Sequence, residues 1–192
     1  MSSLTPGFAS VHEAQSCFRA VLVALSRPGI PVELNTRLTP PGSLSAAAAA
    51  ILLTLTDSSV AVAIPQADAV VQAWLTFHTN ARFSEVGEAD FIVCPAEGSS
   101  RPKLGALRHG TYDEPESGAT LILHAATLAA GRRVCLIGPG IETRLMVNLP
   151  LDEAFFAERA ILQAQAPCGV DILLCAGQRI FGLPRSTFIE VV

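Results

Sequence analysis

The sequence predicts an α/β protein in which a mixed β-sheet is covered by helices, in three layers of the αβα type. Helical and strand-like segments alternate in the first half of the chain, a pattern that is typical of parallel strands. In the second half, pairs of strand-like segments are joined by short turn-forming stretches, which favour hairpins. Because hairpins join antiparallel strands, the two halves together predict a mixed sheet.

The chain is predicted to form one domain over residues 1–192, because no Pro/Gly/Ser-rich linker or charge run divides it. Half of the residues are apolar and only 16% are charged, against about 25% charged in an ordinary globular domain. Too little charge is available to cover the surface, so we expect part of the apolar surface to be buried against another chain. A symmetric homodimer is the commonest way to do this, and we expect the isolated protein to form one.

The first helix is predicted to begin after Ser10, which is followed three residues later by Glu13 and so fits a capping box. Apolar residues follow at helical spacing, and the sequence SRPG ends the helix at Pro28 and Gly29. A short extended piece, PVEL, leads into a helix rich in alanine, a residue of high helix propensity. The predicted elements are then this helix (44–56), strand VAVAI (60–64), a helix over 67–78 and strand FIVC (91–94).

In the second half, a short helix is predicted to begin after Ser99 and Ser100. The strands ATLILHAA and RVCLI (133–137) are predicted to form a hairpin through AAGR. Residues 151–166 carry a broad apolar face and are predicted to be the last helix. The strands DILLC and RIFGL, joined by AGQ, predict a second hairpin.

Charge and composition exclude several classes of protein. The formal net charge is −4, and the single Lys and twelve Arg are scattered, so no basic stripe is available for nucleic acid. The most lipid-like segment, 44–56, is well short of the ~20 residues that span a bilayer, and the start of the sequence lacks the pattern of a secretory signal. We therefore predict a soluble cytoplasmic protein with no membrane partner. Five cysteines without a CxxC pair predict neither disulfides nor zinc.

The stretch LIGPGI (136–141) has two glycines spaced as at the start of a phosphate-binding loop. The third glycine of that fingerprint is missing, and Pro139 has no amide to offer a phosphate. Pro150 follows too soon for a long helix to begin at the loop. We interpret the stretch as a turn in which Gly138 and Gly140 are structural residues.

Ser100 and Lys103 form an SxxK pair, a spacing that occurs in serine-acyl enzymes. That chemistry needs a second lysine and an SDN element, and the sequence contains neither, so a capped surface helix is the preferred interpretation. Lys103 lies in a polar, loop-like setting that is poorly suited to a Schiff base with pyridoxal phosphate. We therefore predict no catalytic residue and no cofactor.

His109, with Asp113, Glu114 and Glu116, offers imidazole and carboxylate ligands close together in the sequence. The same stretch contains Pro115 and a nearby glycine, which are typical of a solvated loop. The loop is the preferred interpretation, so we predict no metal site.

Two further residues are candidates for contact with a ligand or a partner. His78 stands at the end of a predicted helix, where a histidine can also interact with the helix dipole or cap carbonyl groups. Arg185 follows the last predicted strand, where it can bind an anion or a partner, or form a surface ion pair. For each of these two residues, contact with a ligand or partner and a purely structural role stay open as alternatives.

Seven short segments occur in the order and spacing of the PhnH family, a subunit family of the carbon-phosphorus lyase system of phosphonate metabolism. They are FRAVLVALSRPG (18–29), LLTLTD (52–57), FHTNA (77–81), PESGATLIL (115–123), LIGPGI (136–141), GVDILL (169–174) and LPRST (183–187). The sequence therefore resembles that family over about residues 10–190. It departs from the usual pattern at PCGVD, where Phe-Pro more often precedes the glycine, and at PRST, where PRTT is usual.

The resemblance implies a fold similar to the large domain of pyridoxal-phosphate-dependent transferases, without the cofactor lysine. It implies an accessory subunit that assembles with PhnG, PhnI and the radical-SAM subunit PhnJ, and that works with the ATP-binding-cassette-like PhnL. The assembly transfers a phosphonate to the ribose 1-position of ATP and displaces adenine. A stand-alone enzyme, or a ligand-binding protein that uses a vestigial cofactor cleft, remains the alternative.

Overall fold

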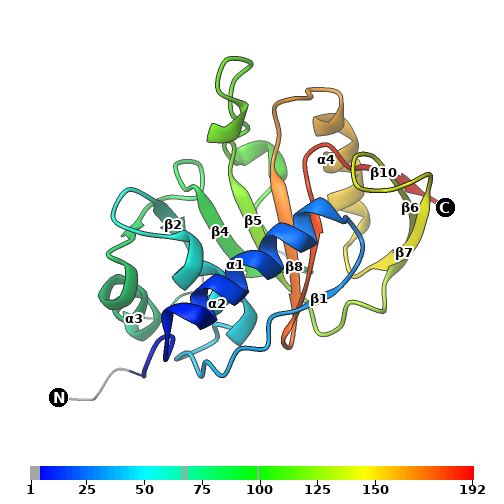
Figure 1. The fold of residues 1–192 in the computed structure, drawn as a ribbon. Coiled ribbons are helices and arrows are strands. Elements are labelled where there is room, and N and C mark those ends of the chain that lie inside the picture. Colours follow the sequence, from blue (N-terminus) through cyan, green and yellow to red (C-terminus); the bar gives the residue numbers. More distant parts are fainter. Residues whose placement is uncertain (1–4, 66, 68, 99) are drawn as a thin grey trace.

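The computed structural model describes residues 5–65, 67, 69–98 and 100–192. Its centre is a seven-stranded sheet (Figure 1) with the strand order β1-β9-β8-β5-β4-β2-β3. Five neighbouring strands, from β3 to β8, are parallel, whereas β9 runs antiparallel to both β8 and β1. The predicted mixed sheet is confirmed. The strands are β1 (Val32–Glu33), β2 (Ala61–Ala63), β3 (Arg82–Phe83), β4 (Phe91–Pro95), β5 (Thr120–His124), β8 (Asp171–Ala176) and β9 (Arg179–Leu183).

Three helices cover one face of this sheet: α1 (Val11–Ser26), α2 (Ala46–Leu55) and α3 (Ala69–Thr79). Residues 47–52 of α2 are completely buried. Four of these six residues are alanines, whose small side chains let α2 pack closely against both the sheet and α1. Helix α1 is buried through Cys17, Ala20, Val21 and Ala24. These contacts fix the position of the N-terminal end of α2 beside the sheet.

The opposite face is covered by a mixture of helix and sheet. Helix α4 (Glu153–Gln163) shares a hydrophobic core with a second, three-stranded antiparallel sheet of order β10-β6-β7. This sheet is formed by β6 (Arg132–Ile137), β7 (Leu145–Leu149) and β10 (Phe188–Val191). Two short 3-10 helices, η1 (Leu104–Ala106) and η2 (Pro115–Ser117), lie in the connection between β4 and β5. The predicted three layers are present, but the third is only partly helical.

The hairpin predicted through AAGR is wrong, because β5 and β6 belong to different sheets. Strand β5 is paired on one side with β4 and on the other with β8, so it has no free edge for β6. Strand β6 instead pairs with β7 and β10, two strands that the sequence patterns did not reveal. The hairpin predicted through AGQ is confirmed by the antiparallel pair of β8 and β9.

No helix in the described part of the chain is both long and apolar enough to cross a membrane. All five cysteines are free and buried.

Candidate functional site

A cavity of about 220 Å³ opens beside the carboxyl ends of three parallel strands, β2, β4 and β5. From β2 the chain leads to β3 on one side, whereas from β4 it leads to β5 on the other. This reversal is the topological switch point of the sheet, where open α/β sheets bind their ligands. The cavity is lined by Ser43, Leu44, Ser45, Ile64, Val71, Val93, Cys94, Pro95 and His124.

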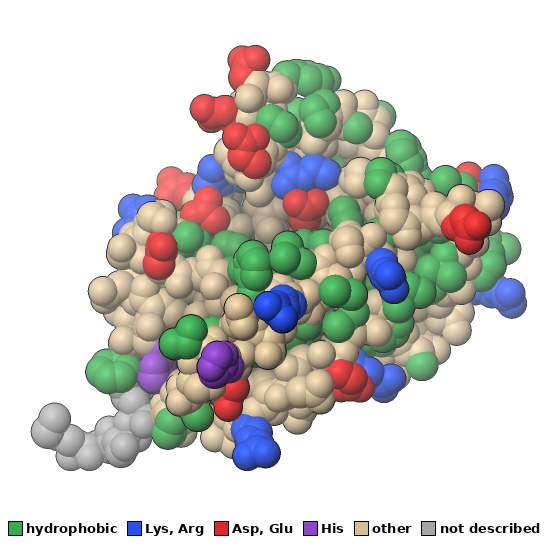
Figure 2. Space-filling view, in the orientation of Figure 1, with side chains coloured by type: hydrophobic (Ala, Val, Ile, Leu, Met, Phe, Trp, Pro, Cys, Tyr) green, Lys and Arg blue, Asp and Glu red, His purple; other side chains and the backbone are tan. Residues whose placement is uncertain are grey.

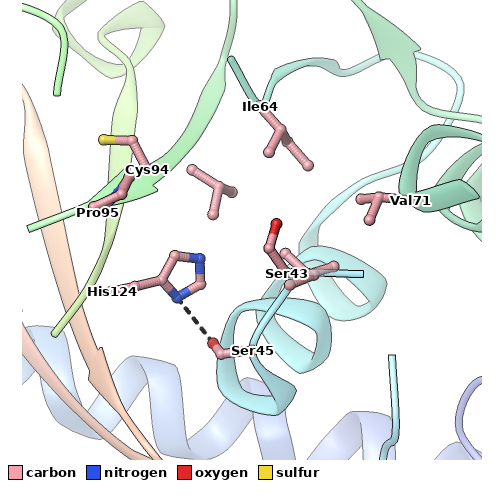
Figure 3. A pocket seen from close by; sticks show the side chains of 9 residues that line it. Ser43, Ser45, Ile64, Val71, Cys94, Pro95 and His124 are labelled. Atoms are coloured by element: carbon pink, nitrogen blue, oxygen red, sulfur yellow. Dashed lines mark hydrogen bonds between the residues drawn. The ribbon is translucent and has the colours of Figure 1, made fainter. Parts of the chain in front are cut away.

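Ser45 and His124 form the polar contact at the base of the cavity. Ser45 is the N-cap of α2, and its Oγ accepts a hydrogen bond from the Ala48 amide at 3.2 Å. The same Oγ lies 3.0 Å from Nδ1 of His124, the last residue of β5. Figure 3 shows this imidazole between Ser45 and the open space of the cavity. Helix α2 and the sheet therefore hold the ring in place from two sides.

The second ring nitrogen of His124, Nε2, is available to a ligand. Among the residues described, the only hydrogen-bond partner of the ring is Ser45, through Nδ1. When the Ser45 hydroxyl donates to Nδ1, Nε2 carries the proton and is a donor, and in the other tautomer Nε2 is an acceptor. The site can therefore offer either kind of hydrogen bond.

The cavity is uncharged at neutral pH. Burial lowers the pKa of His124, so its imidazole is neutral there. Burial also raises the pKa of Cys94 to about 12, which keeps the thiol protonated and unreactive. None of the other described residues that line the cavity has an ionisable side chain. This chemistry favours binding by hydrogen bonds and apolar contact rather than nucleophilic catalysis.

The free energy of unfolding is expected to decrease as the pH falls below about 6.5, with a contribution from His124. In the unfolded chain the imidazole binds a proton at its ordinary pKa of 6.5, whereas in the folded protein burial lowers that pKa. Between the two pKa values the unfolded state binds more protons, so stability rises with pH and is lost on acidification. Urea unfolding of His124→Gln between pH 5 and 8 should show a weaker pH dependence than the parent chain.

Exposed His12 provides the control, since His12→Gln should retain the parent's pH dependence. Equal slopes for His124→Gln and the parent would show that His124 does not carry the effect.

His78 lies outside this cavity, at the last turn of α3. Its Nε2 is 3.2 Å from the carbonyl oxygen of Thr5, which also accepts a hydrogen bond from the Trp74 indole at 2.7 Å. The His78 ring makes edge contacts with the rings of Trp74 and Phe77. In the isolated chain, His78 and Trp74 thus attach Thr5 to α3.

Arg185 is also outside the cavity and is engaged within the chain. Its Nη2 lies 2.7 Å from Oδ2 of Asp171, its Nε lies 3.2 Å from both oxygens of that carboxylate, and Nη1 donates to the carbonyl of Pro115. The Arg185 amide donates to Asp171 as well. The guanidinium therefore links the start of β8 to η2, and an anion would have to compete with Asp171.

The short helix predicted after Ser99 and Ser100 does not begin there. Ser99 lies outside the described residues, Ser100 is in a turn, and the first helical turn that the structure describes after it is η1, which starts after Lys103. Ser100 and Lys103 consequently do not share a helix face as the SxxK chemistry requires. Pro102 disfavours the helical conformation for Arg101 before it, and Lys103 is extended, so no helix begins at Ser100.

His109 is likewise held by the backbone, with Nε2 2.8 Å from the carbonyl oxygen of Leu104. Asp113, Glu114 and Glu116 are exposed on the loop that follows. The described residues contain no group of three or more His, Cys, Asp or Glu side chains placed to hold a metal ion.

LIGPGI comprises the last two residues of β6 and the start of the connection to β7. The amide of Ile141 donates to the carbonyl of Gly138 at 3.1 Å, and Gly138 and Gly140 have φ angles of +147° and +84°. The next regular element is a strand and not a helix. The loop thus lacks the helix N-terminus on which a dinucleotide-binding loop depends.

The sequence patterns missed the cavity residues because no local motif joins them. Ser45 was included only in an alanine-rich helix, and His124 only in a strand. One general signal was available: a polar side chain at the carboxyl end of a buried parallel strand often lies at a ligand site, and His124 ends β5.

These features define a class: an α/β protein with an open, mostly parallel sheet and an uncharged cavity at its switch point. A family model described as bacterial phosphonate metabolism protein (PhnH) matches residues 6–190. The chain therefore belongs to the PhnH family. It is 31% identical over 183 residues to the alpha-D-ribose 1-methylphosphonate 5-triphosphate synthase subunit PhnH of Rhizobium meliloti (strain 1021), covering 94% of this chain and 92% of that protein. It is 30% identical over 182 residues to the putative C-P lyase subunit protein HtxG of Stutzerimonas stutzeri, covering 92% and 86%.

Proposed function

We propose that this chain is an accessory, non-catalytic subunit of the carbon-phosphorus lyase core complex. In this proposal it is needed for transfer of a phosphonate to the ribose C1 of ATP with loss of adenine, which yields ribose 1-methylphosphonate 5-triphosphate. The observation that carries the proposal is the similarity along nearly the whole chain to relatives named as subunits of such a synthase or lyase. The uncharged cavity, with a protonated Cys94 and a neutral His124, supports a role without chemistry of its own.

The proposed partners are subunits of the PhnG, PhnI and PhnJ type, in the cytoplasm, and the chain acts as one domain without a cofactor. We also propose kinship with the large domain of pyridoxal-phosphate-dependent transferases, on the strength of the resemblance and the mixed sheet. Lys103 supports the loss of the cofactor, because it precedes η1 and does not line the cavity at the switch point.

An exposed apolar surface supports the subunit role. Helix α1 crosses the front of the molecule, and Figure 2 shows hydrophobic side chains gathered on that face. On α1, Phe18 is 44% exposed and Leu22 51% exposed, one helical turn apart. Apolar side chains that share one helix face are typical of a surface that another chain covers. We propose that α1 contributes to the homodimer and to the assembled complex.

The test of the proposed function is turnover of ATP and methylphosphonate. The purified chain alone should give none, and mixtures with PhnG, PhnI, PhnJ and PhnL type proteins should be active only when this chain is present. Turnover by the chain alone would contradict the subunit role. It would favour the second candidate function, a stand-alone small-molecule enzyme or binding protein, for which the cavity at the switch point is the supporting observation.

A double variant, Phe18→Asp with Leu22→Asp, should reduce both self-association and activity of the mixture. Burying two carboxylates at an apolar contact without partners is costly, whereas on a free surface they are harmless. Light scattering should show a dimer for the parent and a monomer for the variant, and circular dichroism should show that the variant is still folded.

The matched control is Ile161→Asp on α4, where Ile161 is 68% exposed. It should leave the dimer intact. A parent that is monomeric at every concentration would contradict the homodimer, and dissociation by the α4 variant alone would place the contact on another face.

A further inference from the structure

The cavity at the switch point has a chemical character that restricts its occupant. Leu44, Ile64 and Val93 give it apolar walls, and none of the described residues that line it is charged at neutral pH. A charged ligand would lose its hydration here without meeting an opposite charge among the described residues that line the cavity, which is unfavourable. The occupant that suits the cavity is therefore uncharged. At about 220 Å³ the cavity lies below the range of drug-sized sites, so the occupant is also compact.

The polar groups of the cavity lie on one side of it and suit a ring that carries nitrogen. Nε2 of His124 offers a donor or an acceptor, depending on the tautomer that Ser45 holds. Figure 3 shows the hydroxyl of Ser43 pointing into the same space, with Ile64 and Val71 across the cavity from Pro95 and His124. A flat ring can lie between these walls with its nitrogen-bearing edge toward His124 and Ser43. A purely aliphatic molecule would leave Nε2 without a partner.

We propose that this cavity binds an uncharged nitrogen heterocycle, and that in the assembled complex the heterocycle is adenine. The first half of the proposal depends only on the cavity. The choice of adenine rests on the proposed function, in which adenine is the uncharged base that the reaction displaces from ATP. Adenine carries ring nitrogens that accept hydrogen bonds and an amino group that donates them, which matches the two capacities of Nε2 and the hydroxyl of Ser43.

Calorimetric titration of the full chain with adenine tests the proposal directly. We expect saturable binding of one adenine per chain. His124→Leu, which removes both ring nitrogens, and Ile64→Trp, which fills the cavity, should each weaken binding at least tenfold. His12→Leu changes an exposed histidine on α1 and should leave the affinity unchanged. Thermal melting of each variant, without ligand, shows whether it is folded.

Three outcomes would overturn the proposal. They are no saturable binding of adenine, binding that both cavity variants leave unchanged, and competition for the cavity by methylphosphonate or propanoate, which would show that it takes an anion. Binding of benzimidazole but not adenine would overturn the assignment to adenine. If adenine binds as expected while the mixture of subunits shows no turnover, the cavity assignment stands and the proposed function fails, so the two failures are distinguishable.

Discussion

Replacing Arg159 by methionine is expected to lower the free energy of unfolding by about 2–4 kcal/mol. Arg159 on α4 is only 2% exposed, and burial lowers its pKa to about 10, so the guanidinium is still charged at neutral pH. Its Nη1 donates to the carbonyl of Val170 at 2.8 Å, and its Nη2 donates to the carbonyl of Pro184 at 2.6 Å. A third carbonyl, that of Thr187, lies 3.4 Å from Nη2.

These three carbonyls precede β8 or lie between β9 and β10, so Arg159 joins α4 to both sheets. Hydrogen bonds to a charged group contribute about 1.5–3 kcal/mol each, and methionine leaves buried carbonyls without that donor. Methionine also removes the cost of burying a cation, which offsets part of the stability lost with these hydrogen bonds. The expected loss is therefore smaller than the sum of the hydrogen-bond contributions.

Chemical denaturation of Arg159→Met, Arg159→Lys and Arg144→Met measures this effect. Lysine keeps the charge but lacks the planar fork that reaches several carbonyls, so an intermediate loss is expected. Arg144 is a matched control, because its side chain is 66% exposed and its ion pair with Glu190 is on the surface. Its replacement should change stability by no more than about 0.5 kcal/mol. A loss at Arg159 as small as at Arg144 would contradict the structural role.

The elements that could be predicted from the sequence are those with local signals. The start of α1 was predicted from Ser10 and Glu13, and the Ser10 hydroxyl accepts a hydrogen bond from the Glu13 amide at 3.4 Å. The Glu13 carboxylate in turn accepts one from the amide of Ala9 at 3.1 Å, one residue earlier than a capping box requires. The AGQ hairpin is similarly local, because a short connection allows only an antiparallel neighbour.

Pairing between distant segments could not be predicted. The AAGR stretch has the composition of a hairpin turn, yet β5 has β4 and β8 as neighbours and its successor in the sequence must leave the sheet. Strand β10 pairs with β6 although about fifty residues separate them. Which edge accepts a strand is decided by the whole sheet, and a turn signal contains no information about it.

The buried side of a helix was equally hard to assign. The helical spacing of apolar residues indicated α1 correctly, but Phe18 and Leu22 are exposed whereas Cys17 and Val21 are buried. Helix α1 has apolar residues on more than one side, so periodicity gives its extent without giving its orientation. The low charge of the chain predicted an apolar surface for contact with another chain. Part of that apolar surface lies on this exposed face of α1.

The candidate site lay beyond sequence reasoning for a related reason. Ser45 and His124 are 79 positions apart, and they meet only because the N-terminal end of α2 packs beside the carboxyl end of β5. Neither residue stands in a motif with its own chemical signature. The residues that did stand out, such as His78 and Arg185, are bonded to Thr5 and Asp171 instead.

Replacing Gly140 by alanine is expected to lower the free energy of unfolding by about 2–4 kcal/mol. The φ angle of +84° is itself unfavourable for alanine. A Cβ at this position would also be directly against the carbonyl oxygen of Ser26, and 2.9 Å from Cδ of Pro28. Backbone on both sides cannot move away easily, because Ser26 ends α1 and Gly140 lies between β6 and β7.

Gly177→Ala separates the two causes of this loss. Gly177 has a φ angle of +60°, and no atom lies within 4 Å of the position its Cβ would take. Its replacement should cost about 1 kcal/mol, which is the conformational penalty alone. The difference between the two variants, measured by urea unfolding, is the cost of separating the LIGPGI loop from the end of α1. Equal losses would show that the loop can move away from Ser26.

The Gly140 variant also tests whether this loop holds a phosphate. Three of the segments that carry the family resemblance meet at this loop, namely LIGPGI (136–141), FRAVLVALSRPG (18–29) and LPRST (183–187). Gly140 lies against the end of α1, and a Cβ on Gly138 would be 2.7 Å from the carbonyl oxygen of Ser186. Glycine is therefore required by the packing of the chain against itself. Inorganic tripolyphosphate, which carries no base for the cavity at the switch point, should leave the melting temperature unchanged. A rise that Gly140→Ala abolishes would instead make the loop an anion site, because a ligand that binds only the folded state raises its stability.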